Sequence, residues 1–238
     1  MGKNYAVILA GGSGLRAGSA VPKQFMYLSK KPVILWSVDA FDRIKEINKI
    51  IIVSHRDFIP WIEKRMKRKK SGKSFLVIPG GSTRQESSLN AVKSMDFRDD
   101  DVLIFHDAAR PFVSRRLIIE TLNAAKTYGA SAAYIPLTDT VAEISGLDVK
   151  SIPPREKLFR AQTPQAFRHE IIKKAHEIAL SGLKPATDDV ALVLNAGYKI
   201  RMVSGDPANI KITTAEDFLY AKILIRKMKP ALFSSLKT

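Results

Sequence analysis

Residues 5–16 read YAVILAGGSGLR, where an apolar run leads directly into a glycine-rich turn that carries an arginine. The run over residues 5–9 predicts a buried strand. Glycines after a strand let the backbone turn sharply and bring N–H groups close to an anion. The spacing is not a dinucleotide-binding fingerprint, because Ala17 stands where its third glycine belongs, and no Gly-Lys-Ser/Thr follows to make a P-loop. A strand followed by a different kind of phosphate-binding turn is therefore predicted.

Strands and helices alternate outward from this stretch. Short β-branched runs predict further strands over residues 47–53, 75–78, 102–105, 131–135 and 199–203. Amphipathic stretches predict helices over residues 32–44, 58–70, 83–95 and 115–128, between 187 and 197, and from 213 onward. Thr83 to Glu86 and Thr213 to Glu216 have the pattern of a capping box, and Thr187 is a candidate cap. The alternation predicts an α/β fold, a Rossmann-like, mostly parallel twisted sheet with helices on both faces.

Residues 137–160 interrupt this alternation. They contain Thr138-Asp139-Thr140, a glycine at 146 and Pro153-Pro154, with few apolar residues. We interpret the segment as an extended arm that leaves the main body. Because the chain has no internal repeat and no low-complexity tract, the sequence predicts one domain over residues 1–238 with 137–160 as a protruding arm.

The chain is strongly basic. Its 238 residues include 39 Lys and Arg against 23 Asp and Glu, a formal net charge of +16. Such a charge attracts polyanions, which makes phosphorylated small molecules and nucleic acid candidate partners. Much of the excess lies in residues 63–73, where no aromatic residue interleaves with the cations to stack on bases. We interpret this segment as a solvated helix end and loop.

The composition also excludes several kinds of site. The absence of cysteine excludes disulfides, thiolate catalysis and thiolate metal sites. The first residues lack the features of a secretory signal, and no apolar run is long enough to cross a bilayer. The four histidines have no metal-ligand spacing. We therefore expect a cytoplasmic protein with no membrane partner.

Cations follow the first strand. Ligands in open parallel sheets bind beyond the carboxyl ends of strands, so the residues after each strand are the candidates for chemistry. Arg16 offers a planar fork for phosphate oxygens and Lys23 a compact point charge. Together with the glycine turn they predict a triphosphate site. The alternative is a plain tight turn.

Two later stretches also follow predicted strands. Asp107, after the strand over 102–105, is suited to hold Mg²⁺ beside a triphosphate, and Arg110 to hold an acceptor phosphate. In the alternative interpretation, Asp107 caps a turn and Arg110 pairs with it. A helix is predicted to begin near residues 80–84, and backbone amides at a helix N-terminus favour polar or anionic groups. Ser87, on the first turn of this helix, is placed to reach the edge of a base. The alternative is that these residues only cap the helix. The dispersed residues Thr140, Arg155, Thr187 and Lys211 are each, taken singly, typical of a surface.

Several longer motifs resemble one family. LAGGSGLRAGSAVPKQF at 9–25 is similar to the signature of sugar-phosphate nucleotidyltransferases, and HDAARPF at 106–112 narrows the resemblance. With GGSTRQESS at 80–88, LTDT at 137–140, RAQTPQAF at 160–167, TDD at 187–189 and GDPANIKIT at 205–213, the chain resembles the 2-C-methyl-D-erythritol 4-phosphate cytidylyltransferases. The Asp-Ala-Ala-Arg-Pro and Asn-Ile-Lys-Ile-Thr motifs are more specific for this resemblance than the glycine loop, which many nucleotidyltransferases share. They also occur in the related ribitol 5-phosphate cytidylyltransferases.

The resemblance implies an enzyme that condenses CTP with methylerythritol phosphate, with Mg²⁺ or another divalent cation as cofactor. The product would be CDP-methylerythritol, in the non-mevalonate route to isoprenoids. The implied catalytic residues are Arg16, Lys23, Arg155 and Lys211. The implied nucleotide-binding residues are Ala10, Gly11, Gly12, Gly14, Gly81, Ser82 and Ser87. The implied acceptor-binding residues are Asp107, Arg110, Thr140, Arg155, Thr187 and Lys211, with Asp107 also near the metal.

The resemblance further implies a homodimer. In that family the arm crosses to a second subunit, so Thr140 and Arg155 would complete the neighbour's site. One departure is Ser82, because the family often has an acidic residue there. Ribitol 5-phosphate as acceptor and another nucleotide such as GTP stay open as alternatives. A nucleic-acid-binding protein is a further alternative, which no helix-turn-helix, aromatic RNA-binding motif or zinc module supports.

Overall fold

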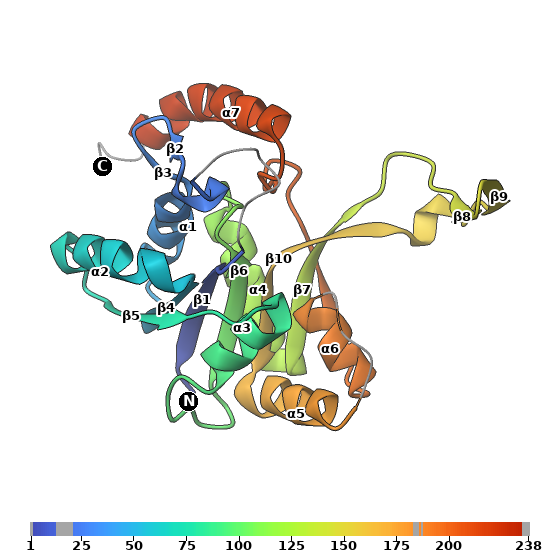
Figure 1. Ribbon diagram of the computed structural model, residues 1–238, viewed down its shortest axis with the longest axis horizontal. Helices are drawn as coiled ribbons and strands as arrows, with labels where there is room; N and C mark the ends of the chain where they lie inside the picture. The colour runs from blue at the N-terminus through green and yellow to red at the C-terminus, as the bar shows by residue number, and fades with distance from the viewer. Residues whose placement is uncertain (1, 13–20, 183–185, 187, 235–238) are drawn as a thin grey trace.

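The computed structural model describes residues 2–12, 21–182, 186 and 188–234. Its centre is a seven-stranded sheet with the order β11-β7-β10-β6-β1-β4-β5 (Figure 1). The strands are β1 (Asn4–Ala10), β4 (Lys49–Ser54), β5 (Ser74–Pro79), β6 (Val102–Asp107), β7 (Ala130–Pro136), β10 (Phe159–Arg168) and β11 (Arg201–Ser204). Among these strands β10 alone runs antiparallel to its neighbours, β6 and β7. The predicted α/β fold with a mostly parallel sheet is confirmed.

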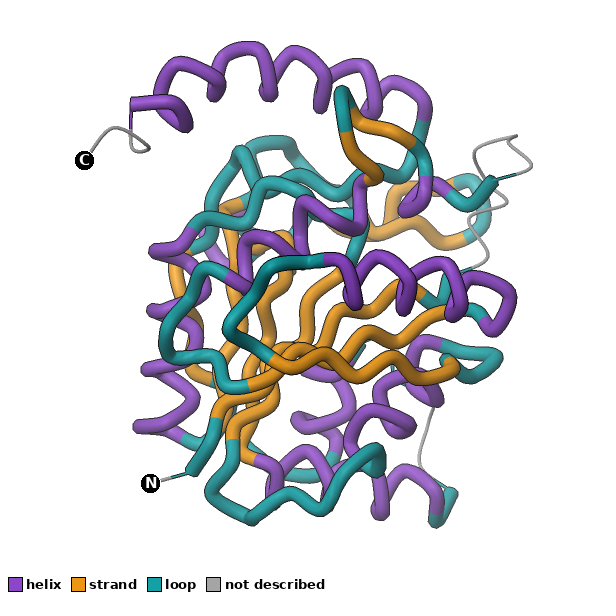
Figure 2. The backbone as a smooth tube through the Cα atoms, turned by 90° about the vertical axis from the view of Figure 1, so that its left-hand side faces the viewer, coloured by secondary structure: helices purple, strands orange, loops and turns teal. Residues whose placement is uncertain are grey.

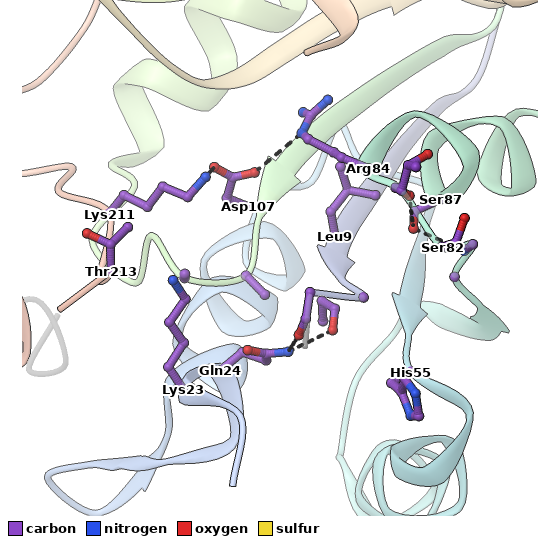
Figure 3. A pocket seen from close by; sticks show the side chains of 18 of the residues that line it. Leu9, Lys23, Gln24, His55, Ser82, Arg84, Ser87, Asp107, Lys211 and Thr213 are labelled. Carbon is purple, nitrogen blue, oxygen red and sulfur yellow. Dashed lines mark hydrogen bonds and ion pairs between the residues drawn. The ribbon is translucent and has the colours of Figure 1, made fainter. Parts of the chain in front are cut away.

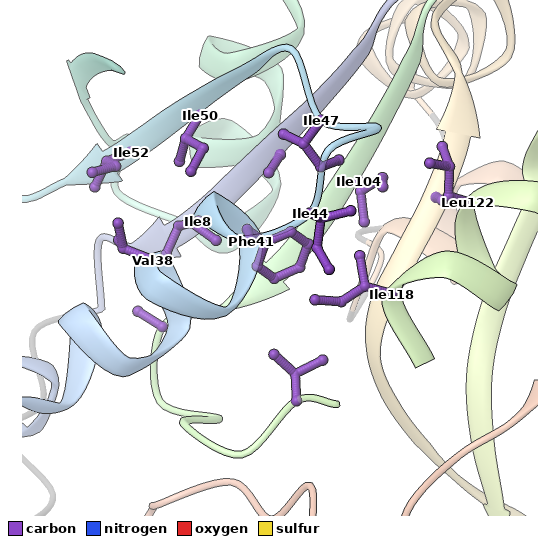
Figure 4. Close-up of a cluster of buried hydrophobic side chains, with 14 of the residues drawn as sticks. Ile8, Val38, Phe41, Ile44, Ile47, Ile50, Ile52, Ile104, Ile118 and Leu122 are labelled. Atoms are coloured by element: carbon purple, nitrogen blue, oxygen red, sulfur yellow. The ribbon is translucent and has the colours of Figure 1, made fainter. Parts of the chain in front are cut away.

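Helices cover both faces of this sheet (Figures 1 and 2). They are α1 (Val33–Asp42), α2 (Ile59–Arg68), α3 (Arg84–Val92), α4 (Arg115–Tyr128), α5 (His169–Leu180), α6 (Asp189–Asn195) and α7 (Ala215–Ser234). Successive side chains of a strand point to opposite faces. Ile8 therefore packs with Phe41 of α1 and Ile118 of α4 (Figure 4), while Val7 packs on the other face with residues of α3, α5 and α6. Each fully buried side chain of this size contributes about 1.5–3 kcal/mol to folding.

The last part of the chain returns across the carboxyl ends of the strands. Ile212 is buried with Ala221 and Ile225 of α7, against Leu28 of the small hairpin formed by β2 (Tyr27–Leu28) and β3 (Lys31–Pro32). The backbone N–H of Ile212 donates to the carbonyl of Ala109 at 2.9 Å. This anchoring places Lys211 beside the end of β6.

Residues 137–158 extend away from the sheet (Figure 1). At the base of this segment, the N–H of Leu137 donates to the carbonyl of Leu158 at 3.1 Å. Its far end is a two-stranded hairpin of β8 (Glu143–Ser145) and β9 (Asp148–Ser151). Large apolar side chains are exposed there, Leu147 completely. The expected role of residues 137–160 as a dimerisation arm stays a prediction.

The sequence pattern predicts no strand or helix over residues 161–180, and in this respect the prediction is wrong. The structure has β10 and α5 in that region. Pro164 lies inside β10 and has no N–H for a ladder hydrogen bond, which argues against a central strand. The strand forms nevertheless because its register with β7 shifts between Ala161 and Gln165, so the proline lies at an irregularity of the ladder.

One of the two predicted capping boxes is confirmed. Thr83 Oγ1 accepts a hydrogen bond from the N–H of Glu86 at 3.0 Å, at the start of α3. The second box lies one residue later than predicted, because Thr214 Oγ1 accepts from the N–H of Asp217 at 3.2 Å. The Asp217 carboxylate accepts in return from the N–H of Thr213 at 2.7 Å. The Asp217 carboxylate also accepts from the N–H of Thr214 at 2.9 Å, which is the reciprocal bond of a capping box, so aspartate takes the place of glutamate here.

The start of α6 also differs from the prediction. Its N-cap is Asp188, whose carboxylate accepts from the N–H of Ala191 at 2.8 Å. Thr187, the expected cap, lies outside the described residues. Asp and Thr both supply a side-chain oxygen for the free N–H groups of a first turn, so the sequence alone does not choose between the two neighbours.

The basic segment over residues 63–73, which spans the end of α2 and the loop after it, is only partly a solvated surface. Lys69 Nζ lies 2.7 Å from Asp39 Oδ1 and 3.1 Å from Asp42 Oδ2, both on α1. Through Lys69 the segment therefore forms ion pairs that link the end of α2 to the end of α1. Other cations of the stretch, such as Lys64 and Lys67, are exposed as predicted.

Candidate active site

A cavity of about 790 Å³ opens at the carboxyl ends of the strands (Figure 3). This volume lies within the range of small-molecule sites. Turns that are far apart in the sequence meet there. The lining residues are Leu9, Ala10, Gly11, Gly12, Lys23, Gln24, His55, Arg56, Gly80, Gly81, Ser82, Thr83, Arg84, Ser87, Asp107, Ala108, Ala109, Lys211 and Thr213.

Gln24 holds the glycine turn in place. Its side-chain N–H groups donate to the carbonyls of Ala10 at 2.9 Å and of Gly12 at 2.8 Å (Figure 3). Gln24 is buried, in a short helical turn that also carries Lys23. The two hydrogen bonds thus fix the position of Lys23 relative to the backbone that follows β1. Gln24 was not predicted as a site residue, although its place directly after Pro22-Lys23 is a usable signal.

The turn between β5 and α3 forms another wall of the cavity. Ser87 Oγ donates to the carbonyl of Thr83 at 2.9 Å and accepts from the N–H of Gly81 at 3.1 Å. The Glu86 carboxylate accepts from the N–H of Ser82 at 2.7 Å. Ser87 and Glu86 therefore form hydrogen bonds with the turn itself, as the alternative interpretation of a helix cap expected. The same bonds hold the backbone of Gly81 and Ser82 at the wall of the cavity.

Gly81 has no room for a side chain. A Cβ at this position would lie 2.2 Å from Glu86 Cβ. We expect Gly81→Ala to distort the turn, lower the melting temperature and weaken nucleotide binding at least tenfold, the effect of losing about 1.4 kcal/mol. Gly72→Ala is the matched control, since a Cβ there meets nothing within 4 Å. Calorimetric titration with CTP checks this, and equal affinities of the two variants would contradict it.

Asp107 lies among three cations. Lys211 Nζ is 2.9 Å from Asp107 Oδ2, Arg110 Nε is 3.5 Å from Oδ2, and Arg84 Nε is 3.9 Å from Oδ1. Burial alone would raise the pKa of the Asp107 carboxyl, but the three cations outweigh it and hold this pKa well below its ordinary value. Asp107 is therefore ionised at any physiological pH. The cluster is a fixed carboxylate with excess positive charge at the cavity wall.

Arg110 has the pairing that the alternative interpretation expected. Besides Asp107, its guanidinium donates to the carbonyls of Asn209 at 3.0 Å and Ala161 at 3.4 Å. Its side chain is 11% exposed and joins three segments of chain. A contact from Arg110 to an acceptor phosphate stays a prediction.

Arg84 belongs to the candidate stretch over residues 80–84, but the sequence predicted no role for its side chain. Its Nη1 lies 2.8 Å from Oδ2 of Asp189, a residue that is 1% exposed. Arg84 thus links the first turn of α3 both to α6 and to Asp107. Its position as the first helical residue after the capping residue Thr83 could have indicated that its side chain lies near the site.

Arg110 is not among the residues that line the cavity, and the other predicted site residues fall into three groups. Those that line the cavity together are Ala10, Gly11, Gly12, Lys23, Gly81, Ser82, Ser87, Asp107 and Lys211. Thr140 and Arg155 lie on the arm, outside this cavity, where Arg155 Nη1 donates to the carbonyl of Thr138 at 3.1 Å. Gly14, Arg16 and Thr187 lie outside the described residues. The cavity also includes His55, Arg56 and Thr213, which were not predicted.

Helix α3 packs against helix α5. His176 Nε2 lies 3.3 Å from Ser88 Oγ, and both residues are buried. Burial lowers the pKa of His176 from 6.5 to about 4, because the raising effect of Asp189 is smaller and Lys93 and Arg84 act in the lowering direction. At neutral pH the imidazole is therefore uncharged in the folded protein.

This histidine makes the fold sensitive to acid. Between pH 6.5 and pH 4 the unfolded chain binds a proton at this position that the folded chain does not, so stability falls as pH falls. The full contribution of His176, present above pH 6.5, is roughly 3 kcal/mol. We expect His176→Gln to flatten the loss of unfolding free energy over this pH window in urea titrations. Parallel pH profiles of the variant and the parent would contradict the assignment.

A family model for 2-C-methyl-D-erythritol 4-phosphate cytidylyltransferases matches residues 5–227. The chain belongs to this family. The cytidylyltransferase of Thermosipho melanesiensis is 41% identical over 216 residues, which is 90% of this chain and 94% of the relative. That of Clostridium perfringens is 37% identical over 228 residues, 95% of this chain and 100% of the relative.

Solved structures of cytidylyltransferases have the same fold. The 4-diphosphocytidyl-2C-methyl-D-erythritol synthase of Anaerococcus prevotii superposes with a TM-score of 0.83 at 30% identity, over 94% of this chain and 99% of that chain. The cytidylyltransferase of Thermus thermophilus gives 0.77 at 28% identity over the same shares. No described helix of the present chain combines the length and apolar character needed to cross a membrane.

Proposed function

We propose that this member of the cytidylyltransferase family condenses CTP with 2-C-methyl-D-erythritol 4-phosphate to give CDP-methylerythritol and pyrophosphate. The observation that carries the proposal is the shared cavity. Lys23 after β1, Asp107 at the end of β6 and Lys211 near α7 line one cavity together with the glycine turn. Family membership supplies the identity of the substrates.

In this reaction an oxygen of the acceptor's phosphate attacks the α-phosphorus of CTP. A new P–O bond forms, the bond to the β-phosphate breaks, and its electron pair leaves with pyrophosphate. A phosphate monoester is ionised at neutral pH, so no strong general base is needed. The protein has to bring two anions together and neutralise the charge that develops on the phosphoryl oxygens.

The residues of the cavity suit this task. Gly11 and Gly12 line the cavity together with Lys23, and we propose that their backbone N–H groups bind phosphate. The β5–α3 turn presents Gly81 and the serines toward the base. Lys211, held by Asp107, is placed to receive the second anion. A cytoplasmic location is part of the proposal and agrees with the cysteine-free sequence.

A divalent cation fits the site only as a partner of the bound triphosphate. Among the described residues, no group of three or more His, Cys, Asp or Glu side chains could hold a metal alone. Mg²⁺ commonly keeps several waters and takes one or two carboxylates plus substrate phosphates. Asp107 supplies such a carboxylate, and we propose it as the protein's contribution. When bound, the ion would neutralise phosphate charge.

The test is an incubation of the purified protein with Mg²⁺ and CTP and either methylerythritol phosphate or ribitol 5-phosphate. We expect a CDP-linked product from methylerythritol phosphate at a rate well above that from ribitol 5-phosphate. Replacing CTP by GTP should abolish pyrophosphate release. A preference for ribitol phosphate or for GTP would overturn the proposal.

We also propose a homodimer in which the arm completes the partner's site. Thr140 and Arg155 lie on the arm and outside their own cavity, while apolar residues such as Ile144, Leu147 and Val149 are exposed at its end. Exposed apolar side chains gathered on one extension are typical of an interaction surface.

Subunit mixing tests the exchange of arms. Lys23→Ala inactivates the body of one subunit, and Arg155→Ala inactivates the arm of the other. If arms serve the neighbouring site, a heterodimer of the two variants has one intact site, so co-expression should restore about a quarter of the activity, because half of the randomly paired dimers are mixed. If each arm serves its own site, no mixture recovers activity. Sedimentation of each variant controls for assembly.

A further inference from the structure

A second cavity, of about 260 Å³, lies between the end of α3 and one face of α5. These two helices pack side by side on the same face of the sheet (Figure 1). The floor is apolar, with Leu89, Val92 and Phe97 among its residues. The cavity lies at the opposite end of α3 from the β5–α3 turn (residues 80–83), which we call the nucleotide turn. It shares no lining residue with the larger cavity.

Buried imidazoles line this second cavity. His169 and His176 are 6% and 2% exposed, two turns apart on α5. Nδ1 of His169 is buried and has no hydrogen-bond partner within the part of the chain that the structure describes. An unsatisfied buried nitrogen is unfavourable, and a bound polar group would relieve it. An apolar floor with one unsatisfied nitrogen beside it is typical of a small-molecule site.

Charges at the mouth indicate the sign of the ligand. Lys93 and Lys173 are exposed there, and neither forms an ion pair with a described residue. Glu177 is paired with Lys174 at 3.5 Å, which leaves Asp96 as the unpaired acid of the mouth. The free cations outnumber the free acid, so the mouth favours an anionic head group on an apolar body.

His176 connects this cavity to the nucleotide turn. Its Nε2 lies 3.3 Å from Ser88 Oγ, in the middle of α3. The next residue toward the helix start is Ser87, which holds the backbone of Gly81. A ligand that contacts His176 therefore acts on the helix whose first turn shapes the wall of the larger cavity.

From this geometry we infer that the cavity between α3 and α5 binds a small carboxylate with an apolar or aromatic body and thereby changes the affinity of the nucleotide site. The effect on nucleotide rests on the proposed function, whereas binding at the second cavity does not. Coupling between two sites of one protein commonly changes affinity about fivefold or more.

Phenylacetate is a suitable probe, with uncharged phenylacetamide as its matched control. Calorimetric titration into the intact protein should show saturable phenylacetate binding with a dissociation constant of about 1 mM, and weaker binding of the amide. Leu89→Trp should abolish binding by filling the cavity, and Lys173→Gln should weaken it. Lys126→Gln, on α4 across the sheet, should change nothing. Melting temperatures report whether each variant is folded.

A second titration measures CTP affinity with and without saturating phenylacetate. We expect a change of about fivefold in the parent protein and none in Ser88→Ala, which keeps the cavity but loses the contact with His176. No saturable binding, binding unaffected by Leu89→Trp in a folded variant, or unchanged CTP affinity in the parent would each overturn the inference. Failure of the parent to bind CTP at all would instead contradict the proposed function.

Discussion

Lys23→Ala is expected to lower kcat by about 10²- to 10³-fold, the effect of removing one donor from a transition-state site. The ammonium group of Lys23 lines the cavity next to the glycine turn, and Gln24 holds both in one arrangement. Negative charge on the phosphoryl oxygens increases as the α-phosphorus is attacked. A fixed cation at that place therefore stabilises the transition state more than the bound substrates.

Steady-state assays of cytidylyl transfer check this prediction. Lys64→Ala is the matched control, because it removes an exposed lysine of α2 outside the cavity. The control should retain parental kcat, and both variants should keep the parental melting temperature. A Lys23→Ala enzyme with nearly parental turnover would exclude the role that we assign to this residue.

Asp107→Asn and Lys211→Ala are each expected to reduce kcat/KM by about 10²-fold, with the double variant little worse than either single one. The two side chains are 2.9 Å apart, and each fixes the other. Removing the carboxylate leaves Lys211, Arg84 and Arg110 close together without their shared counter-charge. The Asp107 side chain is 12% exposed and that of Lys211 is 42% exposed, so solvent screens the pair, and breaking it costs well below the roughly 3–5 kcal/mol of a fully buried pair.

A double-mutant cycle measures this coupling. The assay should be run under conditions where unfolding titrations show every variant to be native. Asp100→Asn is the matched control, since Asp100 is half-exposed and pairs with Arg98 away from the cavity. Strictly multiplicative losses in the double variant would show that Asp107 and Lys211 act independently, and our account of the cluster would then be wrong.

Local sequence patterns were sufficient for much of the fold and for one side of the site. The apolar run before the glycine turn predicts β1, and the Thr83–Glu86 capping box is present as expected. These features depend on residues a few positions apart, whose geometry the backbone fixes. The strand over 159–168 could not be predicted in the same way. A proline such as Pro164 argues against a central strand, and only the structure shows that it lies where the register with β7 is irregular.

The sequence by itself determined the order along the chain of the strands and helices of the main body other than β10 and α5, the glycine turn with Lys23, and the presence of Asp107 at a strand end. Only the tertiary structure decided that Lys211 lies against Asp107, that Arg84 reaches Asp189, and that the arm residues Thr140 and Arg155 lie outside their own cavity. The physical reason is that short-range patterns record local backbone preference. Contacts between distant turns depend on the order of strands in the sheet, which no single stretch of sequence encodes.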